Sequence, residues 1–576
     1  MPDPNTPIVS RRHWLGVATT ASLGALAADA AGAESTGAGG ASPEKDLGAR
    51  TYNVRDYGAK GDGTTLDTAA VQAAIEACTR DQGGTVLVPA GVFVIGTVEL
   101  KSNVRLHLAA QAKLLGSADG HQYHAAEAIP LSGDSTLNDG NVGLLFAVEA
   151  ENITVEGPGA IDGQGAQFRS PTRGVPPPAG IGGSHRPYHL LFHRCRNLTV
   201  RDIFLTASAF HSVRIIQSEH VKLDGIRIYN RVNHNNDGFH FISSRHVHLS
   251  NSTIECQDDA CALFGSCQFV TVTNCSFSTR WSVFRFGGGV AENITVSNCL
   301  IYDTYGCPIK MRCGPGSRFE HISFSDLVMK NVTGPISIGL GPRGSRRATD
   351  QQSAPGTNAP PSSADEAEPP GIVRHISFRG IHATVTVPVQ LADVAFTSGY
   401  NPGEIKSCIG LNAVGAGVIE HVTFDDVHVS FPGGGTVEEA AVRDVPQVVG
   451  EYYQAGVFPA YALFARNVRA LTLSNVRFEV AEPEARPAIV FDHVQDAALN
   501  GLSLQGTKTA ESLLRFIDTR EVLLSAARVL APAAVFLQVE GAASADIKID
   551  GGDFSKAAEP LAFKAGAART AVKTSG

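Results

Sequence analysis

The chain has 576 residues, of which 43% are hydrophobic and 18% are charged, so it can bury a large apolar core. Ten cysteines are too few for a disulfide-stapled scaffold. The 47 Lys and Arg residues stand against 56 Asp and Glu residues, and the net charge of −9 argues against a protein that coats nucleic acid or another polyanion. An anionic ligand would therefore need a local basic patch.

The N-terminus carries the pattern of an export signal. The residues Ser-Arg-Arg-His-Trp-Leu at 10–15 precede a mildly apolar run from Gly16 to Ala28. A paired arginine before such a run predicts a twin-arginine signal peptide over residues 1–33 and a periplasmic or secreted mature protein. The alternative, a membrane anchor, is disfavoured because the run is too short to span a bilayer. Residues 34–50 are rich in Gly, Ala and Ser and are predicted to be a linker.

One helix is predicted over about residues 67–80. Asp67 or Thr68 can cap its start, and Gly83-Gly84 follows its end. Its apolar face consists of Ala70, Val71, Ala74, Ile75 and Cys78. We expect this helix to cap the N-terminal end of the repeats that follow, because exposed strand edges at such an end invite aggregation.

The rest of the chain repeats a short apolar strand followed by a small or polar turn. Between Leu198 and Ile322 the strands start 23 to 28 residues apart. This period indicates a solenoid, and the Leu-x-x-Leu-x-Leu pattern of leucine-rich repeats is absent. A parallel β-helix over residues 51–555 is the fold we predict. Asn251, Asn274 and Asn298 recur at its turns and are expected to stack as a ladder.

Two segments interrupt this pattern. Residues 343–371 are dense in Ser, Pro, Ala, Asp and Glu and are predicted to be a disordered loop between coils. Residues 556–576 are rich in Ala and Lys and are predicted to be a loose tail. Cys275 and Cys299 each follow a ladder asparagine and should stack as small apolar residues, while disulfide pairing stays open.

Three carboxylates stand out near the middle of the array. Asp237 lies in Asn235-Asn236-Asp237-Gly238, and Asp258-Asp259 follows 21 residues later, close to one repeat. Because stacked strands lie about 4.8 Å apart, the three side chains are expected to cluster. Repulsion should raise one pKa and leave a general acid beside ionised partners, as glycosidic hydrolysis requires. Ordinary turn chemistry and a calcium site are the alternatives.

Basic residues follow one and two repeats later, namely Arg280, Arg285, Lys310 and Arg312. They could bind the carboxylate of an acidic sugar or neutralise the aspartates, and both roles are compatible. Trp281 could stack on a sugar ring or fill a corner of a coil. His211, His234 and His240 are more typical of surface or turn histidines than of catalytic ones. No glycine-rich nucleotide loop or zinc motif is found, so no cofactor and no resident metal are predicted.

Several segments resemble one family of enzymes. They are Asn53–Gly63, Gly83-Gly84, Val88–Gly91, Leu100–Val104, Ile161–Gly165 and Arg186-Pro187. Together with Asn235–Gly238 and Asp258-Asp259, they resemble glycoside hydrolase family 28, the polygalacturonase family of the pectin-lyase-like superfamily. The resemblance implies an all-β, single-stranded, right-handed parallel β-helix. It also implies an inverting hydrolase of an acidic, galacturonic-acid-containing polysaccharide or oligosaccharide, expected to act as a monomer.

The resemblance also implies residue roles. Asp258 would protonate the leaving oxygen, and Asp237 and Asp259 would orient and deprotonate the attacking water. Lys310 matches the lysine of the family's Arg-Ile-Lys motif, which contacts the substrate carboxylate. Asn235, Arg280, Arg285 and Arg312 are further candidates for substrate binding.

Two features depart from the family pattern. The Gly-His-Gly motif is missing, with Arg280-Trp281-Ser282 near its place, and Pro308 replaces the first arginine of Arg-Ile-Lys. These departures favour another uronic-acid polymer, a rhamnogalacturonan-type backbone or exo action over plain polygalacturonate cleavage. The alternatives from other classes are a calcium-dependent β-helix lyase, with Arg280 or Lys310 as base, and a non-catalytic carbohydrate-binding solenoid.

Overall fold

The computed structural model describes residues 48–124, 142–168, 186–342, 368–391, 394 and 400–575. Every described residue belongs to the second of the two units into which the chain divides, Asp46–Gly576. The expected signal peptide and all of the expected linker up to residue 47 lie outside the described residues, so both stay predictions. None of the helices in the described ranges has the length and hydropathy that a membrane crossing needs.

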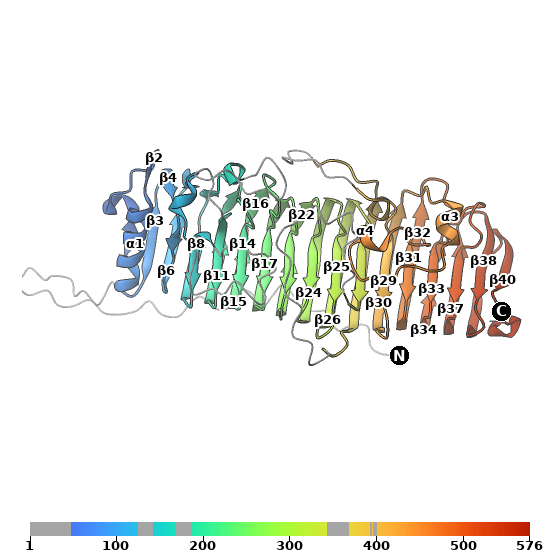
Figure 1. The fold of residues 1–576 in the computed structure, drawn as a ribbon. Coiled ribbons are helices and arrows are strands. Elements are labelled where there is room, and N and C mark those ends of the chain that lie inside the picture. Colours follow the sequence, from blue (N-terminus) through green and yellow to red (C-terminus); the bar gives the residue numbers. More distant parts are fainter. Residues whose placement is uncertain are drawn as a thin grey trace, which may run out of the picture. The chain divides into compact units, whose positions relative to one another are not determined.

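The second unit is a parallel β-helix, as the repeats predicted (Figure 1). Within the described residues, one sheet contains fifteen strands, each paired in parallel with the strand one coil away. These strands are β5 (Val98–Glu99), β8 (Gly143–Val148), β11 (Tyr188–His193), β14 (Val213–Ile216), β17 (Phe239–Ile242), β20 (Cys261–Phe264), β23 (Phe284–Gly287), β25 (Ile309–Cys313), β27 (Ile336–Leu340), β29 (Ile409–Ala413), β31 (Leu463–Arg466), β33 (Ile489–Asp492), β36 (Leu514–Ile517), β38 (Ala533–Glu540) and β40 (Ala557–Lys564).

The second sheet has twenty-six strands within the described residues and supplies the remaining walls of each coil. They are β1 (Thr51–Asn53), β2 (Asp62–Leu66), β3 (Gly84–Val88), β4 (Gly91–Ile95), β6 (Val104–Leu108), β7 (Ala112–Gly116), β9 (Glu151–Glu156), β10 (Ala160–Asp162), β12 (Arg196–Arg201), β13 (Phe204–Thr206), β15 (Glu219–Asp224), β16 (Arg227–Asn230), β18 (Arg245–Ser250), β19 (Thr253–Cys256), β21 (Gln268–Thr273), β22 (Ser276–Thr279), β24 (Val290–Thr304), β26 (Arg318–Val332), β28 (Ile372–Val385), β30 (Ile419–Phe431), β32 (Val468–Val480), β34 (Gln495–Asn500), β35 (Ser503–Leu504), β37 (Arg520–Val529), β39 (Ala545–Asp553) and β41 (Val572–Ser575).

The core follows from the alternation of apolar residues in these strands. Val221, Val247, Val270, Ile294 and Ile322 pair in register on successive coils, and all five are buried. Each coil therefore places an apolar side chain on the one before it. A continuous column of this kind gains roughly 25 cal/mol for each Å² of apolar surface that it removes from water.

The predicted asparagine ladder is confirmed. Asn251, Asn274 and Asn298 all adopt left-handed backbone angles, with φ of 53°, 54° and 54°. Asn274 donates from Nδ2 to Oδ1 of Asn251 at 3.3 Å, and Asn298 donates to Asn274 at 2.6 Å. Cys275 and Cys299, one residue further on, are buried beside the ladder. Short polar side chains tolerate this backbone conformation, which explains the recurring asparagines.

The expected N-terminal helix is present as α1, Thr68–Arg80. Val71, Ala74, Ile75 and Cys78 are buried, and the helix packs against β1 and β3 at one end of the stack (Figure 1). Asp67 does not cap the helix with its side chain, because its carboxylate accepts hydrogen bonds from the backbone amides at positions 60 and 61. Protection of the strand edges by α1 stays a prediction.

The predicted loose tail is wrong. Strand β40 pairs with β38, and β41 pairs with β39, so residues 557–564 and 572–575 continue both sheets. Ala and Lys residues suit a loose tail by composition, but here they occupy strand positions with an existing edge to pair with. Most of the predicted loop at 343–371 lies outside the described residues, and its described end leads into β28.

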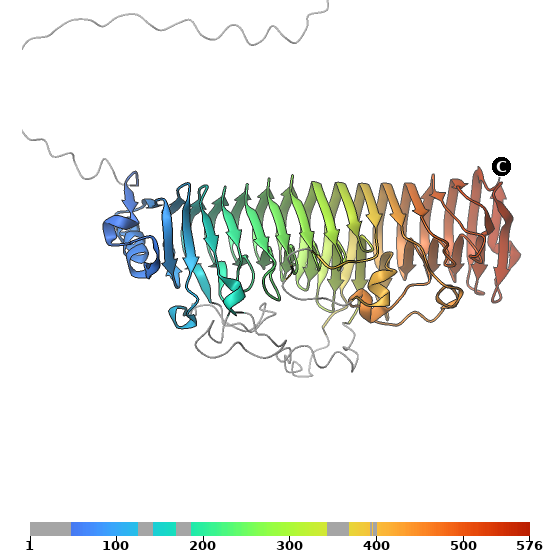
Figure 2. The ribbon, with the colours of Figure 1, turned by 90° about the horizontal axis from the view of Figure 1, so that it is seen from above.

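Two long connections interrupt the C-terminal half of the stack. The connection from β28 to β29 contains α2, Pro402–Ile405, and the connection from β30 to β31 contains α3, Val437–Ala441, and α4, Tyr452–Ala455. Helices α2 and α4 pack against each other, and Figure 2 shows these gold and orange helices along one side of the strands. Short 3-10 helices occur at Val54–Tyr57, Gly120–Gln122, Gly165–Phe168 and Arg569–Ala571.

Candidate active site

The candidate site lies on the connections that lead into successive strands of the fifteen-stranded sheet. Strands β17, β20 and β23 pair in register, so the connections before them are stacked as well. The amide of Gly238 donates to the carbonyl oxygen of Asp259 at 3.0 Å, and the amide of Ala260 donates to that of Ser282 at 2.8 Å. Asp237, Asp259 and Ser282 therefore occupy equivalent positions on three neighbouring coils.

Two residues explain why the Asp237 connection takes this shape. A Cβ on Gly238 would lie 2.5 Å from the carbonyl oxygen of Ala260, so only glycine permits this approach of the coils. The side chain of Asn236 is completely buried and all of its hydrogen bonds stay within the connection and the preceding coil. Its Oδ1 accepts from the amides of Val232 and Asn233, and its Nδ2 donates to two carbonyls, at positions 208 and 210.

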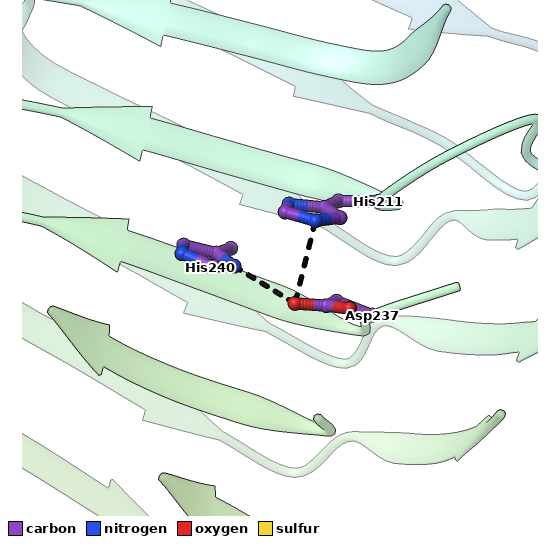
Figure 3. Close-up of side chains that lie close together, drawn as sticks. All are labelled: His211, Asp237 and His240. Carbon is purple, nitrogen blue, oxygen red and sulfur yellow. Dashed lines mark hydrogen bonds and ion pairs between the residues drawn. The ribbon is translucent and has the colours of Figure 1, made fainter. Parts of the chain in front are cut away.

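One carboxylate oxygen of Asp237 faces two histidines (Figure 3). Its Oδ2 lies 2.8 Å from Nδ1 of His240 and 3.5 Å from Nε2 of His211, and all three side chains are buried. The two imidazole rings are stacked, with centroids 4.4 Å apart and planes 9° apart. The interpretation of His211 and His240 as surface residues is wrong, because both are buried, His211 on the connection before β14 and His240 on β17. His234 lies on the same connection as Asp237, where its carbonyl accepts from Arg186.

Burial sets the protonation of this group. It lowers the pKa of both His211 and His240 well below the usual value, so both rings are neutral at neutral pH. A neutral His240 donates from Nδ1 when Asp237 is ionised. The three side chains also offer ligand atoms within 4.8 Å of one another, a donor set suited to a transition metal. In this structure Nδ1 of His240 and Oδ2 of Asp237 are hydrogen-bond partners, whereas Nε2 of His211 lies 3.5 Å from the same oxygen.

Asp258 is the partly exposed member of the carboxylate cluster, whereas Asp237 and Asp259 are buried. Its Oδ2 accepts from Nδ2 of Asn235 at 3.3 Å, and its Oδ1 accepts from the amide of Asp259 at 3.0 Å. Burial and the charge of Asp259 raise the pKa of Asp258 to about 7. Asp258 therefore carries a proton that it can release near neutral pH.

The two buried carboxylates differ in their surroundings. Burial, followed by the charges of Asp258 and Asp259, raises the pKa of Asp237 well above its usual value. Burial also raises the pKa of Asp259, but Arg285, Lys310 and a 2.6 Å hydrogen bond from Ser282 oppose that rise. The predicted clustering of the three carboxylates is confirmed. A proton donor beside a carboxylate held toward ionisation is the pairing that general acid–base catalysis needs.

The basic residues lie on the next two coils, as expected. Ala262, Arg285 and Lys310 pair in register on β20, β23 and β25. Lys310 is completely buried and its Nζ lies 2.5 Å from Oε2 of Glu451. The guanidinium of Arg285 lies 3.5 Å from Oε1 of the same carboxylate. In this geometry the ammonium of Lys310 has no exposed surface, so its contact with a substrate stays a prediction.

The remaining basic residues also have partners within the chain. Arg280 lies 3.7 Å from Glu404, and its guanidinium stacks on the rings of Trp281 and Tyr400 at 5.0 and 4.3 Å. The Nζ of Lys310 lies 4.2 Å from the ring centre of Trp281. Arg312 is partly exposed and donates from Nη1 to two backbone carbonyls, at positions 311 and 337.

Glu404 and Glu451 are the site residues that sequence reasoning missed. Glu404 lies in α2 and Glu451 is the residue before α4, so both come from the long connections after β28 and β30. These connections leave the same edge of the stack as those that carry the aspartates. Nothing in their local sequence marks them, because the repeat pattern stops there and the pairing depends on how far each connection folds back.

The sequence model of Glycosyl hydrolases family 28 matches residues 78–350. An exopolygalacturonase of Platanus acerifolia is 26% identical over 393 residues, which cover 66% of this chain and 95% of that protein. An exo-poly-alpha-D-galacturonosidase of Dickeya chrysanthemi is 26% identical over 337 residues, which cover 49% of this chain and 56% of that protein.

Solved structures show the same fold. A family 28 exopolygalacturonase of Yersinia enterocolitica superposes with a TM-score of 0.54 at 20% identity, covering 78% of each chain. An exopolygalacturonase of Thermotoga maritima superposes with a TM-score of 0.52 at 18% identity, covering 75% of this chain and 92% of that one. The carboxylates and basic residues at 235–312 lie inside the interval that the family model matches, whereas Glu404 and Glu451 lie beyond it.

Proposed function

We propose that this chain, whose residues 78–350 match the model of Glycosyl hydrolases family 28, is a glycoside hydrolase that cleaves, with inversion, glycosidic bonds of a pectin-type polysaccharide or oligosaccharide that contains galacturonic acid. The names of its relatives support the substrate class. The observation that carries the chemistry concerns Asp258. Its side chain is partly exposed beside the two buried carboxylates, and its pKa is raised to about 7. A general acid works best when its pKa lies near the working pH.

In the proposed reaction Asp258 gives its proton to the oxygen that links the two sugars. A water molecule that Asp237 and Asp259 orient attacks the anomeric carbon from the opposite side, the bond to the protonated oxygen breaks, and the water's proton passes to the carboxylate of Asp259. Ser282, Arg285 and Lys310 support this role of Asp259, because each favours its ionised form. His240 supports Asp237 through the bond at Oδ2.

The substrate side of the site is proposed to involve Asn235, Arg280, Arg285, Lys310 and Arg312. Asn235 hydrogen-bonds Asp258 and is partly exposed, so it can contact a sugar hydroxyl beside the acid. Arg312 is partly exposed, whereas Arg280 is buried and is no more exposed than Arg285. Arg285 and Lys310 are buried, so we assign them to the site through their charge. Export and a monomeric state remain predictions.

A panel of pectic polysaccharides tests this proposal. Purified residues 46–576 should release new reducing ends without the ultraviolet absorbance of an unsaturated uronate. Asp258→Asn should reduce the rate by roughly 10²–10⁴-fold, the usual contribution of a general acid. Asp326→Asn is the matched control, since Asp326 is exposed and its neighbours Ser325 and Leu327 pair in register with Ser297 and Cys299, on either side of the ladder residue Asn298. Calcium-dependent absorbance would instead indicate a lyase, and binding without turnover would indicate a carbohydrate-binding solenoid.

A further inference from the structure

We propose that Glu451 determines substrate specificity, because its carboxylate occupies the place beside Lys310 and Arg285 that the carboxylate of an acidic sugar would otherwise take. The sugar that lies against this part of the site then carries no free carboxylate: it is a neutral sugar or a methyl-esterified uronate. This inference rests on the proposed function and specifies the substrate of that same site.

The contacts of Glu451 are those of a bound carboxylate. Its two oxygens face different cations, Oε1 toward Arg285 at 3.5 Å and Oε2 toward Lys310 at 2.5 Å. Glu451 is 6% exposed, Arg285 is 8% exposed and Lys310 is not exposed at all. Both cations therefore already face a carboxylate of the chain, and a second anion at this place would have to compete with Glu451 for them.

Glu451 is also fixed in place by the rest of its connection. It is the residue before α4, and its amide donates to Oε1 of Gln454 at 2.9 Å. The next residue, Tyr452, is buried and donates from its hydroxyl to the carbonyl oxygen of Cys408 at 2.7 Å. These contacts fix the backbone at Glu451, and its buried side chain is held at the two cations. The carboxylate therefore behaves as a built part of the site and not as a mobile surface group.

A second buried carboxylate, on the connection that leads into the neighbouring strand β29, also faces a basic residue of the site. Glu404 is 3% exposed, faces Arg280 at 3.7 Å, and is held by the amide of Asn401 at 2.9 Å. The chain thus supplies its own anions to three of the four basic residues that sequence reasoning assigned to the substrate. A free uronate at this place would meet Glu451 as a like charge in a poorly solvated site, which is unfavourable. A methyl ester or a neutral sugar brings no such charge.

Binding experiments test the inference without requiring turnover. In an Asp258→Asn background, we would measure calorimetric affinities for an oligogalacturonate and for its methyl ester. With Glu451 present, the ester should bind about tenfold tighter or better, since each tenfold corresponds to about 1.4 kcal/mol. Adding Glu451→Gln should tighten binding of the free acid by about tenfold, mostly at low salt, and leave the ester unchanged.

Two matched variants separate charge from structure. Glu451→Asp keeps the negative charge and should keep the preference for the ester, whereas a purely structural role would be damaged by both changes. Glu439→Gln lies in the same connection, where Glu439 pairs with Lys406, and should leave the preference as it is. Equal or tighter binding of the free acid with Glu451 in place would overturn the inference, even if neither Glu451 variant folds. Failure of the proposed function would appear separately, as an absence of cleavage of either ligand by the protein with Asp258 intact.

Discussion

His240 and Asp237 are joined by a 2.8 Å hydrogen bond between Nδ1 and Oδ2, which ties the second residue of β17 to the connection in front of it. His211 of the preceding coil faces the same oxygen at 3.5 Å. Two neutral imidazoles facing one oxygen can orient the carboxyl group without adding a positive charge. We infer that this pair positions Asp237 toward the water that attacks the sugar.

His240→Ala should lower kcat by about 10- to 100-fold with little change in KM, the usual range for groups that orient a catalytic residue. The lost hydrogen bond also stabilises ionised Asp237, so its removal should shift the acidic side of the pH–rate profile upward. His248→Ala is the control, because His248 is exposed and bonds only Thr271 on the outer wall of the coils. An unchanged profile for His240→Ala would contradict the positioning role.

The pH dependence of cleavage follows from Asp258. Because this group must be protonated to act and its pKa is raised to about 7, kcat/KM should fall tenfold per pH unit above that value. Ser282→Ala should act on the other side of the profile. The hydroxyl of Ser282 lowers the pKa of Asp259, so its loss raises that pKa and moves the acidic limb to higher pH. Ser276→Ala, on the outer face of β22, should move neither limb.

Asp258 should also lower the free energy of unfolding at neutral pH, compared with a variant that carries no ionisable group at this position. Its pKa is higher in the folded chain than in the unfolded chain, so its stabilising effect is fully present below about pH 4 and is lost as the pH rises through about 7. Asp258→Asn removes this cost. The variant should gain on the order of 1–3 kcal/mol at pH 8 and progressively less toward pH 4. Denaturant unfolding at several pH values measures this, and a pH-independent difference would rule it out.

Substitution of a ladder asparagine should affect the stability of the protein and not its activity. Asn274→Ala removes the bonds to Asn251 and Asn298 and places alanine at a φ of 54°, which alanine adopts at a cost. The free energy of unfolding should fall by about 1–3 kcal/mol, while kcat/KM stays the same. Denaturant titration and a rate assay on the same sample check both parts. A loss of activity without a loss of stability would show that the ladder does more than hold the coils.

The fold was predictable because it is periodic. The spacing of strands such as Val247–Asn251 and Val270–Asn274 is visible in the sequence, and neighbouring coils obey one register. The same periodicity predicted that Asp237 and Asp258-Asp259 lie close together, because they are about one repeat apart. The tail was misread because its composition, rich in Ala and Lys, says nothing of the strand edge that β40 and β41 extend.

The site was predictable only where it lies on the repeats. His211 and His240 are close to Asp237 because coils stack, a relationship that a reading of each histidine by itself cannot supply. Glu404 and Glu451 come from connections whose length departs from the repeat. Their pairing with Arg280 and Lys310 depends on the path of the chain over several coils. Sequence spacing therefore located the acids and bases but not the groups that neutralise them.

The central claim is inverting hydrolysis by the carboxylate cluster, and real-time proton NMR of the cleavage reaction tests it most directly. With an α-linked oligogalacturonide or its methyl ester as substrate, the β-anomer of the new reducing end should appear first, before mutarotation mixes the two forms, and Asp258→Asn should abolish the signal. First appearance of the α-anomer would contradict inversion. A vinylic proton in the product would contradict hydrolysis altogether, since it arises only by elimination.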